Sequence, residues 1–255
     1  MPLLRDVPPG GTSEVGLSFD DGPTPETTPE LIDLLRRHNA TASFFLTGER
    51  AAQAPHLVAA LVAAGHDVFA HGWRHVACVD EPEYVLHGEM ARTEALLSRF
   101  RPTPEPYLVC LPYVSGRRSA RMHHAIRAWQ PTAQLAFWRF GFEDHRLAEG
   151  CSSETGLQQR CAAAAAPVLA HRRLPSAILL LHEQPTAQTR LKGLSRNDRV
   201  SVVGRLGFRV VLSLLGDRHR CHQKSGSVRG CGGNWWWDWM AIGSAVQGGV
   251  ARHQP

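Results

Sequence analysis

The sequence lacks several features that would assign it to other classes of protein. It has no run of about 20 consecutive apolar residues, which a membrane-spanning helix requires. Its six cysteines form no CxxC pair and none of the spacings typical of small disulfide-rich domains. Despite a formal net charge of +5, its Lys and Arg residues form no basic run of the kind that nucleic-acid binding needs. We therefore expect neither a membrane nor a nucleic acid among its partners.

The N-terminus also lacks the pattern of an export signal. Residues 1–6 contain no basic segment followed by a long apolar stretch. Together with the cysteine pattern, this predicts a reduced, cytoplasmic protein by default, although a secreted protein trimmed of its signal would look the same. The sequence gives no information on the oligomeric state.

Short apolar runs alternate with longer segments of helical periodicity. The runs cover residues 15–19, 41–46, 67–70, 107–111, 134–140, 177–181 and 209–215, and their near-continuous hydrophobicity is typical of parallel strands buried on both faces. Helices are predicted from Thr27 onward, where a Thr cap, an early Pro and a Glu begin a helix, and at residues 51–64, 83–100, 119–129, 156–170 and 190–206. Seven strand–helix units predict an α/β fold, either a barrel or an open wound sheet.

The character of the chain changes after Leu215. Residues 217–255 show little periodicity and much glycine, and a Trp-Trp-Trp-Asp-Trp cluster at 235–239 contains four of the seven tryptophans. Sugars stack on aromatic faces, so a carbohydrate-binding platform is one interpretation; an atypical, poorly ordered extension is the other. We predict a catalytic domain in residues 1–216 and such an extension in residues 217–255.

Two adjacent carboxylates, Asp20 and Asp21, directly follow the first predicted strand. In parallel α/β barrels, catalytic groups lie where strands end and loops begin. Two carboxylates after an apolar strand need a cation or a proton to compensate their burial. One of them can bind a metal while the other stays free as a base, although Asp-Gly-Pro is also ordinary turn chemistry.

Histidines follow two further predicted strands. His71 and His75, four residues apart after the third strand, can converge on one metal ion if the loop makes a helical turn. With 14 histidines in the chain, one such pair is expected by chance. The evidence for a metal site is therefore the position of this pair at the end of a strand rather than its spacing. One carboxylate and two imidazoles form a familiar hydrolytic metal site. His182 closes the sixth strand, either as a core residue or as a general acid.

These segments, in this order, resemble the signature motifs of the polysaccharide deacetylase family, the NodB-homology proteins or family 4 carbohydrate esterases. The resemblance covers about residues 13–215 and implies a distorted (β/α)7 barrel of parallel strands. It implies that Asp20 is the catalytic base and His182 the catalytic acid. It also implies that Asp21, His71 and His75 bind a divalent metal, with Zn²⁺ the expected ion.

The resemblance assigns two further residues. Leu111-Pro112-Tyr113 matches a third motif, in which the Tyr backbone N–H helps to hold the oxyanion, and Asp144 loosely matches the acidic residue that orients the catalytic histidine. The implied reaction is acetamide hydrolysis, in which the metal polarises the carbonyl and activates water. Asp20 would take the proton of the water, the Tyr113 N–H would stabilise the oxyanion, and His182 would protonate the departing amine.

The third motif departs from the family's Arg-x-Pro-Tyr-Gly pattern at two positions. Cys110 stands where the family has an Arg that pairs with the catalytic Asp, so Asp20 should be harder to ionise and less fixed in direction. Val114 stands at a Gly position, where a β-branched side chain would twist the backbone if φ is positive. We expect metal binding to persist and turnover to fall by roughly 10²- to 10³-fold. Cys110 could instead be a thiolate ligand or nucleophile, and Arg74 could replace the missing charge.

The sequence therefore predicts a hydrolase that removes an N-acetyl group from an N-acetylated sugar, an oligosaccharide or a small amide. A catalytically silent homologue that binds glycan or metal is one alternative, favoured by Cys110, Val114 and the Trp-rich segment. A hydrolase of a non-sugar C–N bond is another, favoured by the missing export signal. The remaining expectations are that Phe137 and Trp138 line the core or a groove, that His38, His56, His123 and His124 are solvated, and that His219, Cys221, His222 and Cys231 lack metal-site spacing.

Overall fold

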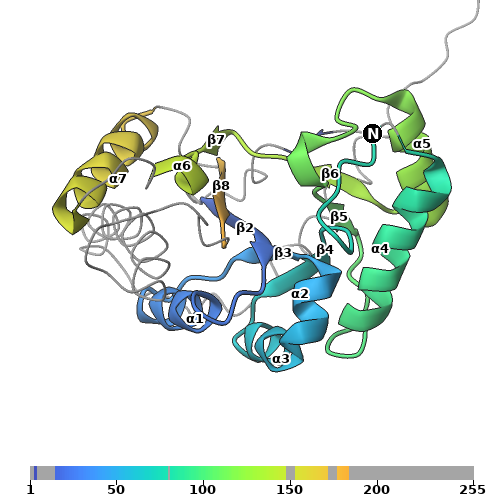
Figure 1. Cartoon of the computed structure of the whole chain (residues 1–255), viewed down its shortest axis with the longest axis horizontal. Coiled ribbons are helices and arrows are strands. Elements are labelled where there is room, and N and C mark those ends of the chain that lie inside the picture. Colours follow the sequence, from blue (N-terminus) through green and yellow to red (C-terminus); the bar gives the residue numbers. More distant parts are fainter. Residues whose placement is uncertain (1–2, 5–14, 80, 148–152, 172–176, 184–255) are drawn as a thin grey trace, which may run out of the picture.

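Strands and helices alternate along the part of the chain that the computed structural model describes, which comprises residues 3–4, 15–79, 81–147, 153–171 and 177–183 (Figure 1). The strands are β1 (Leu3–Leu4), β2 (Gly16–Gly22), β3 (Ser43–Leu46), β4 (Asp67–Ala70), β5 (Leu108–Val109), β6 (Gln134–Ala136), β7 (Phe140–Gly141) and β8 (Ile178–His182). The helices are α1 (Thr28–Arg37), α2 (Gly48–Gln53), α3 (Pro55–Ala63), α4 (Glu83–Leu97), the short 3₁₀ helix η1 (Pro112–Val114), α5 (Ala120–Trp129), α6 (Asp144–Leu147) and α7 (Glu154–Leu169).

All strand pairs among the described residues are parallel. One sheet has the order β4-β3-β2-β8-β7, and a smaller sheet has the order β1-β6-β5. The strands occupy the middle of the molecule and the helices surround them (Figure 1). This confirms the predicted α/β class and its distorted barrel of parallel strands. The strand predicted at residues 209–215, the helix predicted at 190–206 and the extension at 217–255 lie outside the described residues.

A buried polar cluster holds β4 beside β5, where the two sheets separate. The hydroxyl of the fully buried Tyr107 donates to Glu94 Oε2 (2.6 Å) and accepts from the backbone N–H of Ala70 (3.0 Å). The Arg101 guanidinium donates to both oxygens of Glu94 (2.6 and 2.8 Å). Burial raises the pKa of Tyr107, with Glu94 adding to the effect, so the phenol stays protonated and keeps donating. Ala70 is the last residue of β4, so the cluster fixes the position of the backbone directly before His71.

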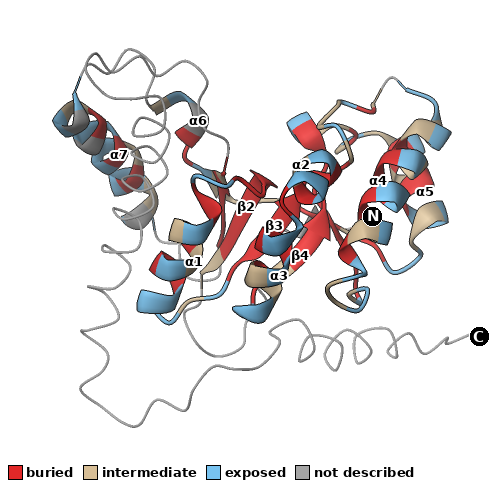
Figure 2. Cartoon of the chain, turned by 60° about the horizontal axis from the view of Figure 1, so that its bottom comes forward, coloured by how far each residue is buried: buried red, intermediate tan, exposed pale blue. Residues whose placement is uncertain are grey.

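The hydrophobic core lies between the strands and the inward faces of the helices, whose outer faces are exposed (Figure 2). Helix α1 follows the predicted pattern, because Leu31, Leu34 and Leu35 are buried on one face. Its start differs from the prediction, since the Thr27 side chain does not cap the helix and instead donates to the carbonyl of Glu183 (3.2 Å).

Two predicted elements are each divided in the structure. The single helix predicted at residues 51–64 is wrong, because the helix breaks at Ala54, whose φ of −132° and ψ of 59° are not helical. Pro55 is the cause, since a proline disfavours the helical conformation of the residue before it. The single strand predicted at 134–140 is also wrong: β6 pairs with β1 and β5, whereas β7 pairs with β8 in the other sheet. No described helix is long and apolar enough to span a bilayer.

Candidate active site

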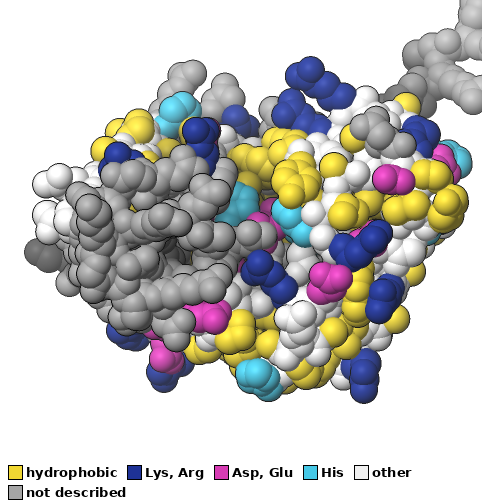
Figure 3. All heavy atoms as spheres, viewed as in Figure 1, with side chains coloured by type: hydrophobic (Ala, Val, Ile, Leu, Met, Phe, Trp, Pro, Cys, Tyr) yellow, Lys and Arg dark blue, Asp and Glu magenta, His cyan; other side chains and the backbone are white. Residues whose placement is uncertain are grey.

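Asp20 and Asp21 form the buried end of strand β2. They belong to the strand rather than following it, and 4% and 5% of their surfaces are exposed. The pairing with β3 shifts register between Asp20 and Gly22, and Asp21 has a φ of 74°. Such an irregularity redirects side chains at the end of a strand, and Asp is one of the residues that tolerate the left-handed region. Figure 3 shows acidic and histidine side chains gathered at the centre of this face of the molecule.

Asp21, His71 and His75 converge as the sequence predicts. Asp21 Oδ1 lies 3.3 Å from His71 Nε2 and 2.8 Å from His75 Nε2, and the three ligand atoms lie within 4.8 Å of one another. His71 Nδ1 is 2.8 Å from the carbonyl oxygen of Cys110 and must donate to it, because that oxygen can only accept. In its neutral form, the form that binds metals, His71 therefore carries its lone pair on Nε2, which faces Asp21.

These three residues fit a divalent cation. Asp21 Oδ1 is buried and has no hydrogen bond of regular geometry among the described residues. Burial opposes ionisation of Asp21, but His71 and His75 more than offset this and hold its pKa well below the ordinary range. Two ligands at about 2.0–2.3 Å from a tetrahedral ion lie roughly 3.3–3.8 Å apart. The Asp21–His71 separation of 3.3 Å is in this range, and His75, at 2.8 Å, would have to move outward by about 0.5 Å. Imidazole nitrogen and carboxylate oxygen are ligands that zinc accepts.

A buried carboxylate, Glu89 of α4, shapes the loop that carries the two histidines. Its Oε2 accepts hydrogen bonds from the backbone N–H groups of Trp73 (2.9 Å) and Arg74 (2.8 Å), and its Oε1 accepts from Arg74 Nε (2.9 Å). Sequence analysis missed Glu89, although a charged residue on the buried face of a helix, next to Met90, was a usable signal. Because Arg74 is paired with Glu89, it does not supply the charge missing at Cys110.

A second buried carboxylate, Glu183, ties the Asp20–Asp21 segment to the strand that carries His182. Its backbone N–H donates to the carbonyl of Asp20 (2.9 Å), its carbonyl accepts from the hydroxyl of Thr24 (3.3 Å), and its Oε2 accepts from the hydroxyl of Thr28. Burial raises the pKa of Glu183 to about 7. The side chain occupies the space next to Gly22, where a Cβ would collide with it. Sequence analysis gave Glu183 no role.

His182 and Asp144 form the pair that the sequence suggested. Asp144 Oδ1 accepts from His182 Nδ1 (2.8 Å), and Asp144 Oδ2 accepts from the His182 backbone N–H (2.7 Å). Burial alone would lower the pKa of His182, but Asp144, with smaller contributions from Asp20 and Asp21, raises it to about 9. In register, His182 of β8 lies beside Asp20 of β2. The two residues therefore meet at the same end of the sheet.

Asp144→Asn is expected to move the basic limb of the pH profile of kcat/KM to lower pH. With Asp144 present, His182 keeps its acidic proton until the pH exceeds about 9. Without the Asp144 carboxylate, the main group that opposes the effect of burial on the His182 pKa is lost. His182 therefore loses its proton at a lower pH. Rates measured between pH 6 and 10 check this, with Glu143→Gln, an exposed neighbour, as control. An unchanged basic limb in Asp144→Asn would contradict the assignment.

Asp20 lies next to the Cys110 thiol rather than a guanidinium. Cys110 Sγ is 3.2 Å from Asp20 Oδ2, while Asp20 Oδ1 is buried without a hydrogen-bond partner among the described residues. Burial raises the pKa of Asp20, opposed in part by His71 and His182. Burial also raises the pKa of the Cys110 thiol well above its ordinary value, with Asp20 adding to the effect. The sulfur is therefore a protonated donor to Asp20, which argues against a nucleophilic thiolate.

The backbone at Val114 is left-handed, which fits the glycine expected at this position. Tyr113 has a φ of 56° and Val114 a φ of 59°. Left-handed φ values are rare outside Gly, Asn and Asp, and a β-branched residue there is an outlier. The Tyr113 ring is 70% exposed and lies 4.7 Å from the His75 ring, so this strained turn borders the candidate metal site.

The free energy of unfolding of the Val114→Gly variant is expected to exceed that of the Val114→Ala variant by about 0.5–1 kcal/mol. Removing Cβ relieves about 1–2 kcal/mol of left-handed strain, and the greater entropy of unfolded glycine offsets part of this gain. Denaturant unfolding measures the difference. Ser115, with a φ of −60°, is the matched control, and there the order should reverse. Equal stabilities of the Gly and Ala variants at position 114 would contradict the strain.

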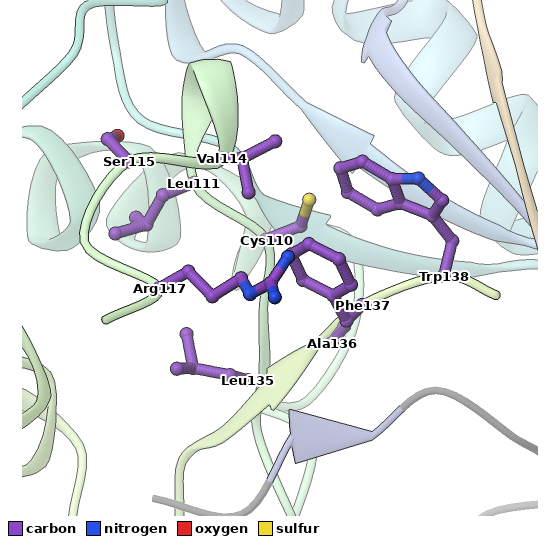
Figure 4. A pocket seen from close by; sticks show the side chains of 9 residues that line it. All are labelled: Cys110, Leu111, Val114, Ser115, Arg117, Leu135, Ala136, Phe137 and Trp138. Atoms are coloured by element: carbon purple, nitrogen blue, oxygen red, sulfur yellow. The ribbon is translucent and has the colours of Figure 1, made fainter. Parts of the chain in front are cut away.

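Phe137 and Trp138 line a hollow beside the site, as predicted. Their rings stack with centroids 4.3 Å apart. The hollow also borders Cys110, Val114 and Arg117, and the Arg117 guanidinium lies over the Phe137 ring (Figure 4). Of the four helix histidines predicted to be solvated, one differs: His123 is half-buried, and its Nε2 lies 3.0 Å from the Arg117 carbonyl oxygen.

Comparison with known proteins identifies relatives by sequence and by fold. The family model described as polysaccharide deacetylase matches residues 8–130. A peptidoglycan-N-acetylglucosamine deacetylase of Bacillus cereus is 41% identical over 93 residues, which are 36% of this chain and 33% of that protein. A chitooligosaccharide deacetylase of Sinorhizobium fredii is 46% identical over 74 residues, 28% of this chain and 34% of the relative. The matches thus span about a third of these relatives, and they confirm the resemblance to the polysaccharide deacetylase family.

Solved structures share the fold over most of the chain. The peptidoglycan N-acetylglucosamine deacetylase Bc1960 superposes with a TM-score of 0.62 at 20% identity, covering 85% of this chain and 87% of the other. The polysaccharide deacetylase Bc1974 from Bacillus cereus gives a TM-score of 0.59 at 22% identity, covering 82% and 89%. A mutant of BA3943, described as a CE4 family pseudoenzyme with restored enzymatic activity, gives 0.56 at 18% identity, covering 82% and 67%.

Proposed function

We propose that this protein is a metal-dependent N-deacetylase of N-acetylated sugars, with Zn²⁺ held by Asp21, His71 and His75. The observation that carries the proposal is the convergence of these ligand atoms within 4.8 Å, beside the buried carboxylate of Asp20. A cation at this position would supply Lewis-acid polarisation of the acetamide carbonyl. A hydrolase of the amide bond needs a base and an acid in addition, and both are available at this end of the sheet.

Each proposed role belongs to a group of suitable chemistry. Asp20 takes the proton of the attacking water, and its Oδ1, which lacks a hydrogen-bond partner among the described residues, is available for this. The backbone N–H of Tyr113 donates to the developing oxyanion. His182 protonates the leaving amine, and Asp144 holds its Nδ1 as the donor, so that the ring is oriented and charged for this step.

The proposed substrate contains N-acetylglucosamine. The two relatives named above are described as acting on peptidoglycan N-acetylglucosamine and on chitooligosaccharides, which share this sugar. The stacked Phe137 and Trp138 rings next to the site offer an apolar surface of the kind on which sugar rings pack.

The test is acetate release from chitooligosaccharides, peptidoglycan fragments and small non-sugar acetamides, each with zinc and again with a chelator. Release from the sugars that requires zinc supports the proposal. Release from the small amides alone would replace it with hydrolysis of a non-sugar C–N bond. A matched inactive control is His71→Ala, which removes the central ligand of the proposed site.

The second candidate is a silent homologue that binds metal or glycan without turnover. Two observations favour it: the Asp20 carboxylate has a thiol rather than a guanidinium beside it, and the Tyr113 N–H lies in a strained turn with Val114. The pseudoenzyme among the solved structures shows that this fold also occurs without activity. Stoichiometric zinc without acetate release from any sugar would favour this candidate.

A further inference from the structure

A second set of possible ligands adjoins the first. The carboxylate of Asp20, the imidazole of His71 and the thiol of Cys110 offer three ligand atoms that lie within 4.8 Å of one another. All three residues are buried, with 4%, 2% and 5% of their surfaces exposed. Asp20 Oδ1 has no hydrogen-bond partner among the described residues, so the set includes an unsatisfied buried carboxylate oxygen.

The separations fit a single ion. Asp20 Oδ2 lies 3.2 Å from Cys110 Sγ and 4.0 Å from His71 Nε2. These values bracket the roughly 3.3–3.8 Å expected between two ligands of a tetrahedral ion at about 2.0–2.3 Å from each. A sulfur, an imidazole nitrogen and a carboxylate oxygen form a set that favours thiophilic divalent cations over hard ones such as Mg²⁺.

The two sets cannot be filled at the same time. His71 Nδ1 donates to the Cys110 carbonyl, so its one lone pair, on Nε2, must serve either set. An ion bound by Asp20, His71 and Cys110 would take Nε2 away from Asp21 and His75. It would also occupy the carboxylate to which the proposed function gives the role of base.

We propose that Asp20, His71 and Cys110 form an alternative site for thiophilic divalent cations, which competes with the Asp21–His71–His75 site and inhibits the protein. Binding breaks only the S–H bond of Cys110, and the proton passes to solvent while the sulfur binds the ion as a thiolate. The inference goes beyond the proposed function, because it assigns a second cation position.

The experiment uses Cd²⁺ and Co²⁺ with the full chain under reducing conditions. Titration with Cd²⁺ should produce a thiolate-to-metal absorption band, which Cys110→Ser should lose. In protein loaded with Co²⁺, Cd²⁺ should bleach the visible Co²⁺ bands, because the two ions share His71. Cys110→Ser should require at least about tenfold more Cd²⁺ for the same bleaching, since even the loss of an outer partner of a metal ligand costs 10- to 100-fold in affinity.

Two variants serve as controls. Cys78→Ser removes another buried thiol and should behave like the unchanged protein. His75→Ala weakens only the first site, so the Cd²⁺–thiolate band should remain. A band of equal strength in Cys110→Ser, or none in the unchanged protein, would overturn the inference. If Cys110→Ser fails to bind Co²⁺ while the Cd²⁺–thiolate band is present in the unchanged protein, the inference stands and the proposed catalytic metal site fails.

Discussion

Asp20→Asn is expected to lower kcat by about 10³-fold, within the range of roughly 10²- to 10⁴-fold attributed to general bases. Asparagine keeps the size of the side chain and an oxygen that can accept from Cys110, but it cannot take a proton from water. Asp20 is not a ligand of the proposed catalytic metal site, so zinc should remain bound. Acetate release measures kcat, and metal analysis after dialysis measures the zinc content.

The pH profile provides a second readout for the same variant. Asp20→Asn removes the ionisation of the proposed base, so the acidic limb that the unchanged protein shows in kcat/KM should be lost or shifted in this variant. Asp33→Asn is the matched control, because Asp33 is exposed and paired with Arg36 on α1. Zinc-replete Asp20→Asn with more than a tenth of the original kcat would contradict the role of Asp20 as base.

Cys110→Arg combined with Val114→Gly is expected to raise kcat by about 10²- to 10³-fold, the amount that one preorganised polar group contributes. A guanidinium in place of the thiol would favour the charged form of Asp20 and fix its direction with two donors. Glycine would relax the turn that carries the Tyr113 N–H. Cys110 borders the hollow beside Phe137 and Trp138, so the longer side chain would have to extend along this hollow or displace its lining.

The single variants separate the two causes. Cys110→Ser retains a neutral donor to Asp20 and should gain little, whereas Cys110→Arg should supply most of the gain. Thermal unfolding of each variant establishes that it is folded, because Arg117 borders the same hollow and places a like charge near the new side chain. A folded double variant with unchanged kcat would contradict the view that Cys110 and Val114 limit turnover.

The sequence predicted which side chains come together, because polar residues at the ends of neighbouring parallel strands lie at the same end of the sheet. Asp21, His71 and His75 converge, as their places after the apolar runs suggested, and His182 meets Asp144, as the family resemblance implied. Val114 also has the positive φ expected of a glycine position. These features depend on local sequence and on the regular geometry of parallel strands, both of which can be inferred without coordinates.

What the sequence could not predict depends on contacts between distant segments. The sequence of the helix that carries Glu89 does not indicate that this side chain bonds to the backbone of Trp73. Glu183 bonds to Thr28, which is far from it in the sequence. The division of residues 134–140 between two sheets is set by the partners of each strand rather than by their own hydrophobicity. Periodicity identifies an element but not its neighbours.

The most direct test of the account is zinc reconstitution of the metal-free protein, with bound zinc and acetate release from a chitooligosaccharide measured together. We predict that acetate release rises in proportion to zinc up to one equivalent, at a low rate, and that excess zinc does not raise it further. His71→Ala should bind less zinc and release no acetate. Release that is the same in the metal-free protein, or that persists at full rate in His71→Ala, would contradict a catalytic metal held by Asp21, His71 and His75.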